Sequence, residues 1–129
     1  MPSHILLIAD DLDQSQLFSL VLRRAGFRVT AVDTGEKALA GISKEPFDLI
    51  VTDYMLPDIN GDAIINILRE AGNTTPIILM SNHVDIHYIG RRSQANACYP
   101  KDDIFKLVTL VKGLLPNPSS NGTPLSASA

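Results

Sequence analysis

Five side chains that could do chemistry stand directly after apolar runs of the sequence: Asp10, Asp11, Asp53, Ser81 and Lys101. Burying a lone carboxylate at the end of an apolar run is costly, so the aspartates need polar partners. Two carboxylates about 4 Å apart repel by roughly 4 kcal/mol at an effective dielectric constant near 20. A lysine and a divalent cation would offset that repulsion. A set of donors made only of oxygen favours Mg²⁺ over zinc.

Asp53 is the candidate nucleophile of this set. A carboxylate beside Mg²⁺ and an ammonium group can attack phosphorus and form an aspartyl phosphate. Mg²⁺ and Lys101 would offset the charge on the phosphoryl oxygens in the transition state, and Ser81 is placed to hydrogen-bond the phosphoryl group afterwards. Taken singly, each aspartate would more often be a helix cap or a solubilising surface residue. The prediction of phosphoryl chemistry therefore depends on the aspartates lying together.

The elements that would bring them together alternate along the chain as apolar runs and helical patterns. This alternation predicts an α/β fold, with a parallel sheet, right-handed crossovers and helices on both faces. For five strands the leading arrangement is a flavodoxin-like (βα)5 three-layer sandwich with strand order 2-1-3-4-5. The predicted strands are residues 5–9, 27–32, 49–53, 77–80 and 95–99, and the predicted helices are residues 13–25, 34–43, 61–71, 84–93 and 103–115.

Helix boundaries are marked by capping signals. Asp13 with Gln16 resembles a capping box at the start of the first helix, and Gly26 is a natural stop for it. Gly72 would end the third helix in the same way. In the predicted sheet the order reverses between strands one and three, and ligands bind there, outside the carboxyl ends of the strands. All five candidate side chains would then lie along one edge.

Composition limits the class of protein. The 129 residues suit one domain, and a formal net charge of −3 argues against direct binding to nucleic acid or to an anionic membrane. Cys98 is the only cysteine, so no internal disulfide forms. No apolar run is long enough to cross a bilayer, and we expect a soluble cytoplasmic protein. We expect a folded domain over residues 1–115, followed by a disordered tail or linker start over residues 116–129, which are rich in Pro, Ser, Asn and Gly.

Four segments together closely resemble the receiver domain of two-component response regulators. In chain order they read ILLIADD, VTDYMLPDINGD, PIILMSN and PKDD, and the resemblance covers residues 4 to 115. It implies a signalling switch in a phosphorelay, phosphorylated on Asp53 with Mg²⁺. The phosphoryl donor would be a histidine kinase or a histidine phosphotransfer protein. Such a domain is a phosphoacceptor rather than an enzyme, with at most a slow autophosphatase activity.

The resemblance also implies roles for single residues. Asp11 would bind Mg²⁺ directly, Asp10 would do so largely through water, and the backbone carbonyl of Met55 would be a further ligand. Ser81 matches the switch hydroxyl, and Lys101 matches the lysine of the family. Downstream, the domain would contact another protein, and it could form a homodimer.

Departures from the family pattern cluster between Ser81 and Lys101, an interval shorter than is usual in the family. Cys98 stands where the family has an aromatic residue, and Asn82 stands where it has a small one. These changes leave an alternative open, a pseudo-receiver that binds a partner protein without phosphorylation. A phosphohydrolase on a similar sheet would need a second aspartate two residues after Asp53. Met55 occupies that position, and its side chain has no carboxylate. His4 is expected at the surface.

Overall fold

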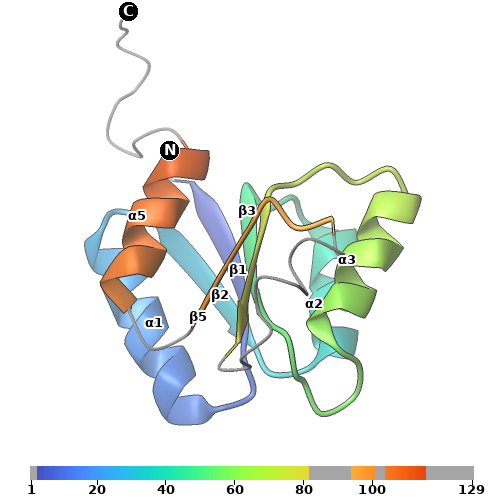
Figure 1. Ribbon diagram of the computed structural model, residues 1–129, viewed down its shortest axis with the longest axis horizontal. Coiled ribbons are helices and arrows are strands. Elements are labelled where there is room, and N and C mark those ends of the chain that lie inside the picture. The colour runs from blue at the N-terminus through green and yellow to red at the C-terminus, as the bar shows by residue number, and fades with distance from the viewer. Residues whose placement is uncertain (1–2, 82–93, 101–103, 116–129) are drawn as a thin grey trace, which may run out of the picture.

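The computed structural model describes residues 3–81, 94–100 and 104–115 (Figure 1). Five strands form one parallel sheet in the order β2-β1-β3-β4-β5, as the alternation of patterns predicts. The helix predicted over residues 84–93 lies outside the described residues. The elements are β1 His4–Ile8, α1 Leu12–Arg24, β2 Arg28–Val32, α2 Gly35–Lys44, β3 Leu49–Asp53, α3 Gly61–Glu70, β4 Ile77–Ser81, β5 Ala97–Pro100 and α5 Ile104–Leu114.

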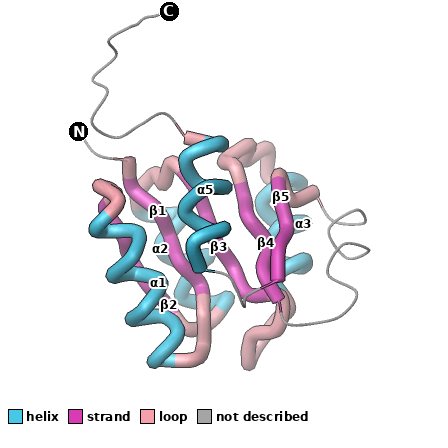
Figure 2. Tube along the Cα trace, turned by 60° about the vertical axis from the view of Figure 1, so that its left-hand side comes forward, coloured by secondary structure: helices cyan, strands magenta, loops and turns pink. Residues whose placement is uncertain are grey.

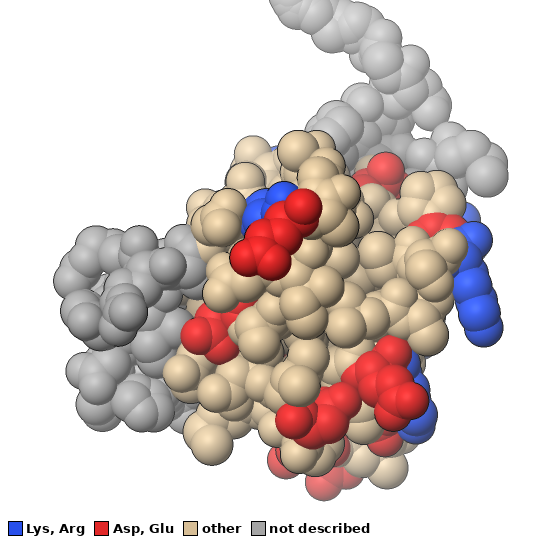
Figure 3. All heavy atoms as spheres, turned by 90° about the vertical axis from the view of Figure 1, so that its right-hand side faces the viewer, with Lys and Arg blue, Asp and Glu red and all other residues tan. Residues whose placement is uncertain are grey.

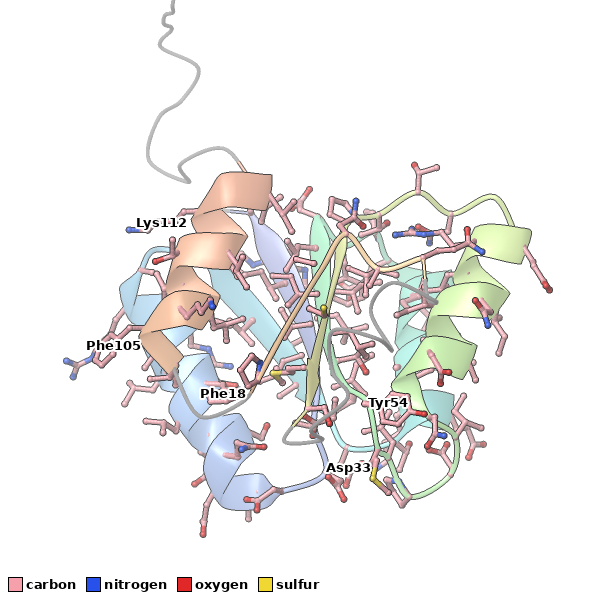
Figure 4. All side chains as sticks on the ribbon, in the orientation of Figure 1. Phe18, Asp33, Tyr54, Phe105 and Lys112 are labelled. Atoms are coloured by element: carbon pink, nitrogen blue, oxygen red, sulfur yellow. The ribbon has the colours of Figure 1, made fainter. Side chains whose placement is uncertain are left out.

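Helices cover both faces of the sheet, with α1 and α5 on one side and α2 and α3 on the other (Figure 2). Every residue of β1, β3 and β4 is buried, which explains why these strands read as continuous apolar runs. Alternate residues of these strands belong to two separate hydrophobic clusters. Ile5 and Leu7 pack under α1 and α5, while Leu6 and Ile8 pack under α2 and α3. Phe18 lies between α1 and the sheet (Figure 4). None of the helices in the described ranges is long and apolar enough to cross a membrane.

The predicted glycine stops are confirmed. Gly26 has φ of 102° and Gly72 has φ of 82°, the left-handed conformation that glycine adopts readily. The predicted start of the first helix is wrong. Helix α1 begins at Leu12, because the side chain of Asp11 accepts a hydrogen bond from the Gln14 nitrogen and caps the helix two residues earlier than Asp13 would.

His4 is buried, which contradicts the expected surface position. It opens β1, which lies between β2 and β3, and side chains of Thr30, Glu45 and Phe47 surround its ring. Its side chain is near Thr30, with 2.7 Å between Nε2 and Oγ1, and its ring centroid lies 4.6 Å from that of Phe47. The main-chain nitrogen of His4 also donates to the Asp48 carboxylate at 2.7 Å. His4 is therefore buried although its side chain is polar.

Arg69, near the end of α3, ties together three segments at the amino edge of the sheet. Its guanidinium donates to the main-chain oxygens of Asn73 and Thr75, at 3.0 and 2.8 Å, and to that of Gln94 at 3.1 and 3.2 Å. It also donates to Oδ1 of Asn96 at 2.8 Å. Partial burial lowers the pKa of the guanidinium from its usual value, but the group stays charged.

Asn96 links Arg69 to the sheet. Its Oδ1 accepts from the Ile77 nitrogen at 2.9 Å, and its own nitrogen donates to the Ile77 oxygen at 2.8 Å. These bonds stand one residue before the pair Ile78–Ala97, so they set the register in which β5 lies on β4.

We expect Arg69→Ala to lower the free energy of unfolding by about 2–3 kcal/mol, because several main-chain acceptors lose a charged donor. The matched control is Arg24→Ala, an exposed arginine at the end of α1, which should change it by less than about 0.5 kcal/mol. Urea denaturation followed by circular dichroism measures both. Equal losses in the two variants would contradict the anchoring role of Arg69.

Candidate functional site

The carboxyl ends of β1 and β3 bring the three aspartates to one edge of the sheet. The two strands are paired in parallel, with Ile8 beside Thr52, so the residues that follow each of them emerge next to each other. Asp53 is the last residue of β3 and is only 1% exposed, whereas Asp10 and Asp11 are exposed after the end of β1. The sheet thus holds one carboxylate inside and presents two at the rim.

Ser81 and the residue before Lys101 extend this edge to the next two strands. Ser81 ends β4 and is 5% exposed, and the preceding residue of β4, Met80, pairs with Asp53. Pro100 ends β5 and pairs with Ser81. Lys101 follows Pro100 directly in the sequence and lies outside the described residues. The described part of the predicted set is therefore gathered at one edge.

The aspartates fit Mg²⁺ in donor chemistry, since all of them offer oxygen at the edge where β1 and β3 adjoin. Their side chains would have to turn toward one another to enclose an ion. Across the described ranges, no three His, Cys, Asp or Glu side chains are grouped closely enough to hold a metal. The carboxylate of Asp11 also serves as a helix cap, with 3.0 Å from its Oδ1 to the Gln14 nitrogen. The other carboxylate oxygen of Asp11, Oδ2, is therefore the one that would bind a cation.

The turn after Asp53 is held tightly against the end of β3. The Gly61 nitrogen donates to the Tyr54 oxygen at 2.6 Å, which closes the loop over residues 54–60. A Cβ atom on Gly61 would collide with the main-chain oxygen of Asp53 and would lie 3.1 Å from Leu79. The glycine is thus required by the close approach of two backbones, a reason that its spacing in the sequence does not show.

Asp58 fastens the same loop to α2. Its Oδ1 accepts from the Gly35 nitrogen at 2.9 Å and its Oδ2 accepts from the Glu36 nitrogen at 2.8 Å. Thr34 caps the next free nitrogen of the helix, with 3.1 Å from its Oγ1 to the Lys37 nitrogen. The two hydrogen bonds from the start of α2 lower the pKa of the Asp58 carboxyl. Asp58 was not among the predicted site residues, because its only local signal is an aspartate after proline in a turn.

Red carboxylates lie along the lower margin of the face in Figure 3, and others lie higher on the same face. Asp33, at the lower end in Figure 4, pairs with Lys37 at 2.9 Å, and the hydrogen bond from Lys37 lowers the pKa of Asp33. Both side chains are more than half exposed, so this ion pair adds little stability.

Cys98, where the family has an aromatic residue, is half-buried on the face covered by α2 and α3. Its neighbour Ala97 packs on the opposite face, under α1 and α5. The two faces alternate along β5, as the period of a strand requires.

Comparison with known proteins places this arrangement in a family. Residues 5–108 match the family model described as response regulator receiver domain. A two-component response regulator of Oryza sativa subsp. indica, ORR11, is 33% identical over 84 residues, which cover 63% of this chain and 57% of the relative. The chain spans between 13% and 61% of the lengths of the curated relatives that it matches first.

Solved structures agree with the family match. A putative response regulator from Chloroflexus aurantiacus J-10-fl superposes with a TM-score of 0.82 at 29% identity, covering 88% of this chain and 98% of that one. The response regulator TrrA from Thermotoga maritima, solved in complex with Mg²⁺ and BeF, gives a TM-score of 0.79 at 26% identity, covering 88% of this chain and 99% of that one. The match over residues 5–108 and the shared fold show that this chain belongs to the response regulator receiver domains.

Proposed function

We propose that this receiver domain accepts a phosphoryl group on Asp53 from a histidine of a partner kinase or phosphotransfer protein, and that the modification acts as a signalling switch. The observation that supports this most directly is the carboxylate of Asp53, 1% exposed at the end of the central strand β3, beside the rim that carries Asp10 and Asp11. A carboxylate in that position is screened from bulk water, which strengthens its interaction with nearby charges.

In the proposed step, an oxygen of Asp53 forms a bond to phosphorus as the bond from phosphorus to the donor imidazole nitrogen breaks. The electron pair of the broken bond stays on the imidazole. Ser81, at the end of the neighbouring strand β4, would then donate its hydroxyl to the phosphoryl oxygens. Lys101, directly after Pro100 of β5, would bring an ammonium group to the same oxygens.

Asp10, Asp11, Asp53 and the main-chain carbonyl of Met55 are the groups that would hold Mg²⁺. When bound, the ion would supply positive charge next to the phosphoryl oxygens. The Mg²⁺ and BeF in the TrrA structure support this assignment by likeness of fold. The domain would release the phosphoryl group to water slowly and has no other enzymatic role in this proposal.

Incubation with acetyl phosphate and Mg²⁺ should give one phosphoryl adduct by intact mass. Asp53→Asn should abolish the adduct because it removes the attacking carboxylate. Asp13→Asn changes an acidic residue in the first turn of α1 and should leave the adduct unchanged. No adduct on the wild type, under conditions that modify another receiver domain, would overturn the proposal and support an interaction module that works without phosphorylation.

The loop anchor gives a second prediction about Mg²⁺. Asp58→Ala should weaken Mg²⁺ binding severalfold in calorimetric titration, because the loop that carries the Met55 carbonyl is no longer fastened to α2. Thr34→Ala is the matched control, since it removes a cap of the same helix and leaves the loop fastened. It should cost about 1 kcal/mol of stability and leave Mg²⁺ binding unchanged. Equal effects of both variants on Mg²⁺ would mean that the caps act through α2 alone.

Acid should remove the stabilising effect of Asp58. Hydrogen bonds lower the pKa of this carboxyl below its unfolded value of 3.8, so its contribution is complete above that pH and is lost as the pH falls through the lower folded value. The difference in unfolding free energy between the wild type and Asp58→Ala should therefore be constant near neutral pH and shrink below pH 3.8. Urea titrations across this range measure it. A difference that grows toward low pH would contradict this sign.

A further inference from the structure

A hollow of about 620 Å³ lies between α1, the end of β1 and the outer edge of β2. Its volume falls within the range typical of ligand pockets. It begins beside Asp10 but runs away from Asp53, along the side of the sheet. The residues that line it are Ala9, Asp10, Leu12, Ser15, Gln16, Ser19, Leu20, Arg23, Ala31, Val32, Asp33 and Lys37.

Two buried hydroxyls face this hollow. Ser15 is 8% exposed and Ser19 is 5% exposed, and both residues line the hollow. Beside them, Leu12 is 70% exposed and Leu20 is 49% exposed. The hollow thus presents two hydroxyls and two exposed apolar side chains to the same occupant.

The edge of β2 offers main-chain groups to the same space. The Ala9 nitrogen donates to the Val32 oxygen, and the Arg28 nitrogen donates to the Ser3 oxygen, so residues 28 and 32 point toward β1. Residues of a strand alternate in this respect, and the N–H and C=O of Ala31 therefore point outward from the sheet. β2 is an outer strand of the sheet, so these groups can pair with an added strand.

Arg23 closes the far end of this open edge. Its Nη2 donates to the main-chain oxygen of Val29 at 3.0 Å, which takes up the outward carbonyl two residues before Ala31. The near end holds the ion pair between Asp33 and Lys37, which both line the hollow, and Asp10 adds one negative charge there. The stretch of α1 from Leu12 to Arg23 is about 16 Å long, which matches an extended segment of five residues.

We infer that the hollow binds an extended peptide segment of a partner protein, which pairs antiparallel with the edge of β2. The central residue of the segment, opposite Ala31, is apolar and packs between Leu12 and Leu20. The residue two places before it is basic and meets Asp10, beside the ion pair of Asp33 with Lys37. The residue two places after it is acidic and meets Arg23. Such strand addition uses main-chain bonds for affinity and alternate side chains for specificity.

This inference does not depend on phosphorylation, and a titration of the unmodified ¹⁵N-labelled chain followed by NMR tests it. The probe is acetyl-Lys-Thr-Val-Thr-Glu-amide. The control peptide, acetyl-Glu-Thr-Val-Thr-Lys-amide, has the same composition with its charged ends exchanged. The first peptide should bind at least about tenfold more tightly than the second, a difference of about 1.4 kcal/mol, and should shift the amide signals of Ala31 and Ser19.

Two variants locate the site. Ala31→Pro removes the outward N–H and should weaken binding about tenfold, while the bonds from β2 to β1 remain, because proline is tolerated on the open side of an edge strand. Leu20→Asp changes an exposed side chain of the wall, so the fold is unaffected, and it should weaken binding to a similar degree. Phe105 is an exposed side chain of α5, so Phe105→Ala should leave binding unchanged.

Three results would overturn the inference. They are equal affinities for the two peptides, binding that neither Ala31→Pro nor Leu20→Asp weakens, and the absence of shifts in the hollow at millimolar peptide. If the shifts appear instead on α5 around Phe105, the peptide binds another face of the domain, and the edge of β2 is not the site.

Discussion

The carboxylate of Asp53, buried at the end of a strand that is covered on both faces, is the constraint on which this structure depends. A charge in that position is tolerated only where the edge of the sheet is polar. The parallel order of the strands supplies such an edge, since β3 ends there in Asp53 and β4 in Ser81, and Asp10 follows two residues after β1. The apolar interiors of these strands fix Asp53, and their polar ends make its burial possible.

The loop after Asp53 also helps to hold the end of β3 in place. Gly61 lets the start of α3 approach the Asp53 carbonyl, and Asp58 fastens the loop to the first nitrogens of α2. The loop is therefore held at both ends by main-chain hydrogen bonds and close packing. In this way α2, which contributes no residue to the site, takes part in positioning it.

Two surfaces share Asp10 but differ in chemistry. The rim around Asp53 is acidic and suits a cation and a phosphoryl group, whereas the hollow beside α1 combines apolar walls, buried hydroxyls and opposite charges at its two ends. The difference arises from the sheet, because the carboxyl edge exposes strand ends while the outer side of β2 exposes main-chain groups.

The sequence by itself determined the fold class, the strand order and the edge at which Asp10, Asp11, Asp53 and Ser81 lie, because apolar runs and their polar ends are local patterns. Only the tertiary structure decided that His4 is buried, that Asp58 holds α2 and that Ser15 and Ser19 line a hollow. These features join residues far apart in the chain, such as Asp58 and Gly35, which stand 23 positions apart. Local spacing carries no record of such contacts, since they form only when the sheet brings the elements together.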